Sequence, residues 1–293
     1  MTAVASVRTS PWAAPRRRAL ALRERYPFAG EVLGLYLALL TAWEEAWPDA
    51  RTALTTSSTD PDIAAWAAER VLPGIVAATI EAGPGPLVDQ LRVLAEHDPV
   101  ALDPVAGEQL LAAWLAGEDL VPVERYLARA AVRVAMEATG EPALDDSSAG
   151  DDARDQTRHC PRCGGPPQLS FQGDAGDDLV NSARQLQCAR CGHSWAFSRS
   201  TCPSCGESRG GRLTFYAEQR AGVQVGRSRG DTDATFPQLR IVACGSCDHY
   251  LIDVDLSRDP LAVPEVDELA ALPLDLYAAE LGLRKITPNI MGF

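Results

Sequence analysis

The residues best suited to chemistry in this chain are its cysteines. The 293-residue sequence contains eight, and all of them fall into Cys-x-x-Cys pairs. The four pairs are Cys160/Cys163, Cys188/Cys191, Cys202/Cys205 and Cys244/Cys247. One such turn brings two sulfurs to a metal ion, and two turns complete a tetrahedral site. The sequence therefore predicts two metal sites, each with four cysteine ligands.

The residue after each second cysteine supports this interpretation. Gly164, Gly192 and Gly206 occupy that position in three pairs, where a positive φ closes the turn around the metal, and the fourth pair has Asp248. Pairs adjacent in the sequence can share a metal, which joins 160/163 with 188/191 and 202/205 with 244/247. An interleaved arrangement is the alternative, and the spacing leaves both open.

Other uses of Cys-x-x-Cys fit the sequence less well. A disulfide framework is typical of exported proteins, a thioredoxin-like redox pair explains one pair and not four, and the bacterial ferredoxin spacing is absent from the sequence. Three of the four histidines, His159, His193 and His249, flank the pairs and are expected to be exposed polar residues rather than ligands.

The predicted sites are not suited to catalysis. Four protein thiolates leave no open position for water or substrate. The sequence also has no recognisable triad, carboxylate pair or phosphate-binding loop. We therefore expect a protein that is not an enzyme and has no catalytic residues. Its cofactors would be two Fe or Zn ions, each in a tetracysteine site, because both metals accept this ligand set.

The first half of the sequence has helical periodicity. One apolar stripe predicts a helix that Pro48-Asp49 ends: Val32, Leu33, Tyr36, Leu37, Leu40 and Trp43. A second helix is predicted to open at Asp60-Pro61, with Asp60 as its N-cap, and Pro73-Gly74 to break it. Further helices are predicted at 87–96, 107–116 and 123–139. An all-α helical domain is therefore expected over residues 1–140.

The second half differs from the first in composition and in the periodicity of its apolar residues. Residues 141–156 are rich in Asp, Ser and Gly and are predicted to be a linker. The short alternations at 185–187 and 239–242 predict strands, and a last helix is expected over 266–283, disturbed by Pro273. The predicted class is α+β, with one small tetracysteine metal domain at 157–200 and a second at 201–293 that includes the C-terminal helix.

Charge is distributed unevenly along the chain. The net charge is −13, and residues 26–153 carry 22 acidic side chains against six arginines. Residues 154–240 carry 12 arginines and eight acids, but two loaded four-thiolate sites would offset that excess, which argues against nucleic-acid binding. No stretch approaches the roughly 20 apolar residues of a membrane span, and no signal peptide is recognisable. A cytoplasmic protein without membrane insertion is predicted.

The order of the cysteine motifs resembles a known family. The motifs are Cys160-Pro-Arg-Cys-Gly-Gly-Pro-Pro, Leu186-Gln-Cys-Ala-Arg-Cys-Gly-His-Ser-Trp195, Arg199-Ser-Thr-Cys-Pro-Ser-Cys205 and Cys244-Gly-Ser-Cys-Asp-His-Tyr-Leu251. Together they resemble the formate dehydrogenase accessory protein family, FdhE. The segments 18–36 and 267–275 are also similar to the start and the end of that family.

This resemblance implies a fold and a function. The fold would be a helical domain followed by two rubredoxin-like (zinc-ribbon-like) folds that bind iron or zinc through the eight cysteines. The function would be that of a cytoplasmic chaperone, which binds the catalytic subunit of a respiratory formate dehydrogenase and assists its post-translational assembly. Two alternatives are a zinc-ribbon nucleic-acid-binding protein and a rubredoxin-like one-electron redox partner. The client's identity and the choice between monomer and homodimer stay open.

Overall fold

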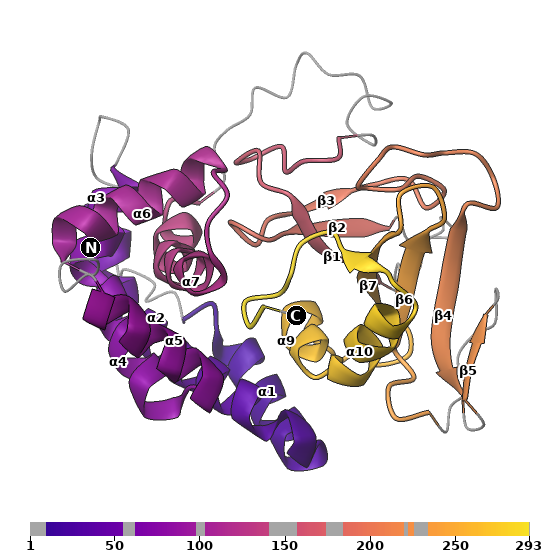
Figure 1. Ribbon diagram of the computed structural model, residues 1–293, viewed down its shortest axis with the longest axis horizontal. Coiled ribbons are helices and arrows are strands. Elements are labelled where there is room, and N and C mark those ends of the chain that lie inside the picture. Colours follow the sequence, from indigo (N-terminus) through magenta and orange to yellow (C-terminus); the bar gives the residue numbers. More distant parts are fainter. Residues whose placement is uncertain are drawn as a thin grey trace, which may run out of the picture.

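Helices occupy the first half of the chain and strands most of the second (Figure 1). The computed structural model describes residues 10–54, 62–97, 103–140, 157–173, 184–219, 222–225 and 234–292. The predicted linker at 141–156 lies outside these residues, and the predicted domain boundaries stay predictions. The predicted α+β class, with an N-terminal helical region and two tetracysteine clusters in the C-terminal part, is confirmed.

The helical half comprises seven α-helices and one 3₁₀ turn among the described residues. They are α1 (Ala13–Arg25), η1 (Pro27–Ala29), α2 (Gly30–Ala53), α3 (Ile63–Arg70), α4 (Leu72–Ala82), α5 (Gly85–His97), α6 (Pro104–Ala116) and α7 (Pro122–Ala138).

Helix α2 does not end where the sequence predicted. It continues through Pro48 to Ala53, although an internal proline costs roughly 3 kcal/mol through its missing N–H and its clash with the preceding turn. The turns beyond Pro48 bury Ala50 and Leu54, and Trp47 packs edge-on against Trp12 at 5.3 Å. Tertiary burial therefore outweighs the local preference of proline.

Helix α3 begins slightly later than predicted. Asp60 and Pro61 lie outside the described residues, and Asp62 is the N-cap, since its side chain accepts a hydrogen bond from the N–H of Ala65 at 2.9 Å. The predicted break near Pro73 is confirmed: α3 ends at Arg70, and Pro73 lies in the first turn of α4.

Helix α7 forms the centre of the helical half. Twelve of its seventeen residues are buried, several of them alanines that allow neighbouring helices to approach closely. The helix packs against α2, α3, α4 and α6. The indole N–H of Trp43 on α2 donates to the carbonyl of Ala130 at 2.9 Å, which fixes α2 on α7.

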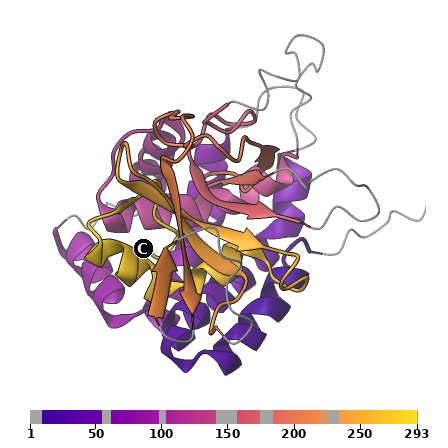
Figure 2. The same cartoon turned by 90° about the vertical axis from the view of Figure 1, so that its right-hand side faces the viewer.

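The strands form one mixed sheet, which faces the viewer in Figure 2 with helices behind it. Its strands are β1 (Pro167–Gln172), β2 (Gln185–Cys188), β3 (Ser194–Ala196), β4 (Leu213–Gln219), β5 (Gly222–Val225), β6 (Leu239–Cys244), β7 (His249–Asp255) and β8 (Arg284–Lys285). The order is β3-β2-β1-β7-β6-β4-β5, with β8 beside β7. The parallel pairing of β1 with β7, at Ser170 and Asp253, joins the two cysteine-bearing segments into one sheet.

Two short helices, α9 (Pro264–Leu269) and α10 (Leu272–Glu280), lie between the helical half and the sheet (Figure 1). The sequence predicted a single helix here, but the chain breaks at residues 270–271, and Pro273 stands in the first turn of α10. A proline fits that position because its missing N–H has no intrahelical partner there.

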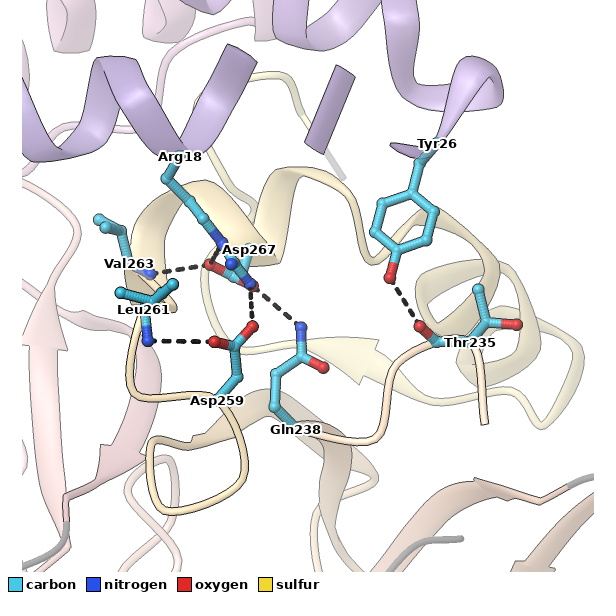
Figure 3. A network of polar contacts seen from close by, with 8 residues as sticks. All are labelled: Arg18, Tyr26, Thr235, Gln238, Asp259, Leu261, Val263 and Asp267. Carbon is cyan, nitrogen blue, oxygen red and sulfur yellow. Dashed lines mark hydrogen bonds and ion pairs between the residues drawn. The ribbon is translucent and has the colours of Figure 1, made fainter. Parts of the chain in front are cut away.

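A buried ion network fastens α1 to this region (Figure 3). The Arg18 guanidinium lies 2.5 Å from the Asp267 carboxylate and 2.6 Å from that of Asp259. Asp267 also accepts hydrogen bonds from the Gln238 amide at 2.9 Å and the Val263 N–H at 2.8 Å. The buried carboxylate is therefore fully paired, and it joins segments that are far apart in the sequence.

Candidate metal centres

The eight cysteines meet in two groups of four. The first cluster contains Cys160, Cys163, Cys188 and Cys191, and the second contains Cys202, Cys205, Cys244 and Cys247. Within each cluster all sulfur atoms lie within 4.8 Å of one another. The fold thus groups pairs adjacent in the sequence and not interleaved pairs. All eight cysteines are free thiols without disulfide bonds.

Both clusters are built in the same way by the sheet. One pair lies in the loop before a strand, and the other begins at the last residue of the antiparallel neighbour. Pro167, at the start of β1, pairs with Cys188 at the end of β2. Leu213, at the start of β4, pairs with Cys244 at the end of β6. The strand register therefore brings the two turns of each cluster together.

The turns have the predicted backbone geometry. Gly164, Gly192 and Gly206 have φ of 68°, 71° and 78°, and Asp248 has φ of 57°. Each of these residues donates its N–H to the carbonyl of the first cysteine of its pair, for example Gly164 to Cys160 at 2.9 Å. The prediction of a positive φ at these positions is confirmed. Asp248 is the only non-glycine residue with a positive φ in the described part of the chain.

The sulfur geometry fits a tetrahedral metal ion. Metal–sulfur bonds of about 2.3 Å place tetrahedral sulfurs about 3.8 Å apart. The sulfur–sulfur contacts are 3.4–3.6 Å in the first cluster and 3.8–3.9 Å in the second. The N–H groups of Arg190 and Ser246 point at the sulfurs of Cys188 and Cys244, at 3.3 and 3.4 Å. Two clusters that could each hold one metal ion are thus present.

The four thiols of the first cluster differ in pKa, because each forms hydrogen bonds with the others. Hydrogen bonds from Cys160 and from the other sulfurs lower the pKa of Cys188. Hydrogen bonding with the same neighbours raises the pKa of Cys191. Hydrogen bonding between Cys160 and Cys163 raises the pKa of Cys160 and lowers that of Cys163. A bound cation would favour the thiolate form of all four sulfurs, because a nearby positive charge lowers the pKa of a thiol.

The two clusters differ in exposure. In the first, Cys160, Cys188 and Cys191 are buried and only Cys163 is half-buried. In the second, Cys205 is exposed and Cys247 half-buried. The first cluster faces the helical half, since Arg162 beside Cys163 donates to the carbonyl of Met136 at 2.5 Å. Solvent reaches the second cluster more readily.

The histidines that flank the cysteine pairs do not belong to either cluster. Each cluster consists of cysteines alone within the described residues. His159 is exposed, and the Nδ1 of His249 lies 2.8 Å from the carbonyl of Cys247. The backbone carbonyl of His193 accepts the N–H of Cys188 at 2.9 Å. The roles of the eight cysteines as metal ligands stay a prediction.

Sequence reasoning missed one residue that shapes the first cluster. A Cβ atom on Gly165 would lie 2.8 Å from the sulfur of Cys188 and 3.3 Å from that of Cys163. Only a glycine lets the chain pass this close to the sulfurs. The signal was the doubled glycine after Cys163, in which Gly164 supplies the positive φ and Gly165 the space.

One pair of helices meets a hydropathy criterion for membrane spans. No single helix in the described ranges is long and apolar enough to cross a bilayer. Helices α3 and α4, bent by 46° at their junction, pass the test together by length and composition.

Part of the chain is similar in sequence to proteins named FdhE homolog. No family model matches the chain. A stretch of 135 residues is 31% identical to a protein named FdhE homolog from Aquifex aeolicus, which covers 46% of this chain and 42% of that protein. The FdhE homolog of Pseudomonas aeruginosa is 30% identical over 132 residues, with 45% and 38% covered. The matched part thus spans about two fifths of these relatives.

A solved structure shares the fold over nearly the whole chain. The crystal structure of the FdhE protein from Pseudomonas aeruginosa superposes with a TM-score of 0.60 and 22% sequence identity, and covers 96% of this chain and 95% of that one. The resemblance to the FdhE family indicated by the cysteine motifs is therefore confirmed, by sequence similarity to FdhE homologues over part of the chain and by the FdhE fold over nearly all of it.

Proposed function

We propose that this chain is an FdhE-type accessory protein and not an enzyme. It would bind the catalytic subunit of a respiratory formate dehydrogenase in the cytoplasm and assist its post-translational assembly. Each four-cysteine cluster would hold one Fe or Zn ion. The observation that carries this proposal is the pair of four-cysteine clusters on an FdhE fold.

The chemistry of the clusters supports a binding role. With four thiolates around one ion, a metal keeps no free position for a substrate. The energy of metal binding would instead stabilise the turns, which are short loops at the strand ends; structural zinc contributes roughly 10–16 kcal/mol in small finger peptides. The cysteines of this chain would therefore stabilise its fold and, with it, the surface that binds a partner.

The acidic helical half is the surface that we propose for the client. Residues 26–140 carry 17 acids and six arginines, and several of these acids are exposed, among them Glu69, Asp89 and Asp119. A basic export signal on the client would be attracted to such a surface, because complementary charge speeds encounter and favours the correct partner.

An anaerobic pull-down tests the proposal. The tagged chain is retrieved from the native cytoplasm and its partners are identified by mass spectrometry. Recovery of the catalytic subunit of a formate dehydrogenase is expected. Recovery of nucleic acid, or of an unrelated electron-transfer enzyme, would contradict the proposal in favour of the zinc-ribbon or rubredoxin-like alternative.

Charge reversal tests the acidic surface separately. Combined Glu69→Lys, Asp89→Lys and Asp119→Lys substitutions should abolish recovery of the client. The control is Glu280→Lys, which reverses an exposed acid on α10 outside the helical half, and should leave recovery unchanged. Equal recovery with the triple variant and the control would exclude these three acids from the docking surface.

A further inference from the structure

Three arginines gather beside the first cluster. Arg129 and Arg133 come from α7, and Arg190 lies within the Cys188–Cys191 turn. They line a cavity of about 30 Å³ together with Glu265 and five other residues. Arg129 and Arg190 are only 8% and 7% exposed, so these charges are largely withdrawn from water.

Two of these arginines hold the turns of the cluster directly. Arg190 donates to the carbonyl of Cys163 at 3.0 Å, and its guanidinium lies 5.7 Å from the ring centre of Trp114 on α6. Arg133 packs on Gly192, where an added methyl group would overlap its guanidinium. The cluster is therefore in contact with the helical half through arginines on both sides of the interface.

The hydrogen bonding of these arginines is incomplete. The Nε atoms of Arg133 and Arg190 are buried, and neither has a hydrogen-bond partner within the described residues. Arg133 is paired with Glu265 at 3.1 Å, whereas Arg129 donates to the carbonyl of Pro288 at 2.7 Å and to the Gln168 amide oxygen. Burial lowers the pKa of Arg129 to about 10, so it stays charged at neutral pH.

One of the three arginines needs the loaded cluster as its counter-charge. Arg133 pairs with Glu265 at 3.1 Å and with Glu137 at 3.9 Å, and the charge of the buried Glu268 acts on Arg129. Arg190 is the guanidinium of this group that has no carboxylate partner within the described residues. Uncompensated buried charge is strongly unfavourable. Four thiolates on a divalent ion carry two negative charges, directly beside these arginines. Without that charge, the polar partners of Arg190 in the described part of the chain would be the Cys163 carbonyl and the ring face of Trp114.

The second cluster has a different environment. Arg158 is exposed and donates to the carbonyl of Ser204 at 2.7 Å. Arg209 is also exposed and is neutralised by Glu207 at 2.6 Å. Among the described residues near this cluster, the buried guanidinium is that of Arg184, on which the charges of Asp253 and Cys202 act. Water can screen the charge of this cluster, whereas the first depends on protein groups.

We propose that Arg190 compensates the negative charge of the metal-loaded first cluster, and that metal in this cluster holds α7 against the sheet through the contacts of Arg129 and Arg133. The arginines are positioning residues, since they act on the metal through the charge and placement of the cysteine turns. This inference depends on metal in the first cluster and not on client binding, so it and the proposed function can fail independently.

Metal release to a chelator tests the proposal on the full chain loaded with zinc. Two phases are expected, a fast one from the exposed second cluster and a slow one from the first. Cys205→Ser should remove the fast phase and thereby assign it. Arg190→Gln should accelerate the slow phase by about 10- to 100-fold, the range typical of residues that support metal ligands.

Two further variants separate charge from packing. Arg190→Lys retains the positive charge and should keep the slow phase within about threefold of wild type, by the same reasoning. Arg158→Gln removes a guanidinium that contacts a turn of the second cluster and should leave the slow phase unchanged. A slow phase that is unaltered in Arg190→Gln, or equally accelerated in the glutamine and lysine variants, would overturn the charge-compensation argument.

Hydrogen exchange tests the link to α7. Removing the metal should reduce the protection of the α7 amides, while α1, which packs against α2 and α9, keeps its protection. The same protection of α7 in the loaded and metal-free chain would refute the proposed coupling. Circular dichroism of each variant confirms that its helices remain folded before the kinetics are compared.

Discussion

A single methyl group at Gly165 should weaken the first metal site. In Gly165→Ala the new Cβ would lie 2.8 Å from the sulfur of Cys188, a separation that real Cβ atoms essentially never show. Ordinary contact begins near 3.4 Å, so the sulfur must retreat by about 0.6 Å. Metal–sulfur distances tolerate changes of only about 0.2 Å. The backbone itself accepts alanine here, because the φ of Gly165 is not positive.

The expected loss follows from the cost of overpacking. Inserting a methyl group into a well-packed site costs about 1–3 kcal/mol. If the whole cost falls on metal binding, the affinity of the first cluster for its metal ion drops about 5- to 150-fold, since 1.4 kcal/mol corresponds to a tenfold change in the dissociation constant. The neighbouring contacts give no relief, because the same methyl group would lie 3.0 Å from the Cβ of Arg190.

Competition with a chromophoric chelator measures this loss. Gly245→Ala is the matched control, because it adds a methyl group within the Cys244–Cys247 turn, where the nearest atom is a carbonyl oxygen at 3.6 Å. The control should bind both metals with wild-type affinity, whereas Gly165→Ala should bind one normally and one weakly. Wild-type affinity for both metals in Gly165→Ala would refute the assigned geometry of the first cluster.

Three more perturbations test other parts of the structure. Asp267→Ala leaves Arg18, whose side chain is 10% exposed, with half of its ion pairing, and should lower the free energy of unfolding by about 3–5 kcal/mol; a thermal midpoint equal to wild type would contradict the network. Asp62→Ala removes the N-cap of α3 and should cost about 1 kcal/mol in urea denaturation, so an unchanged midpoint would argue against the cap. Cys205→Ser should lose one metal equivalent while the helical circular dichroism persists, and complete unfolding would show that the helical half depends on the second cluster.

Local sequence determined what could be foreseen. The cysteine turns were predictable because four residues fix two sulfurs on one metal, and Gly164, Gly192 and Gly206 report the backbone conformation that this requires. Helix α2 was also predictable from nearby residues, because the apolar residues that begin at Val32 recur at helical spacing and share one face of the helix.

Long-range contacts determined what could not be foreseen. Pro48 stays inside α2 because distant side chains bury the turns after it. The parallel pairing of β1 with β7 joins Ser170 to Asp253, and neither strand carries a sign of its partner. Nothing in the sequence near Arg129 and Arg133 indicates their burial, but in the fold they line a cavity beside the first cluster. Their environment is a property of the assembled fold.

The metal content of the purified chain tests the central claim most directly. After anaerobic reconstitution we predict two metal ions per chain, each with four sulfur neighbours at about 2.3 Å in X-ray absorption. Cys188→Ser should reduce the content to one ion with a four-sulfur shell. Fewer than two ions in the wild-type chain, or nitrogen and oxygen neighbours in place of sulfur, would contradict the assignment of both clusters as metal sites.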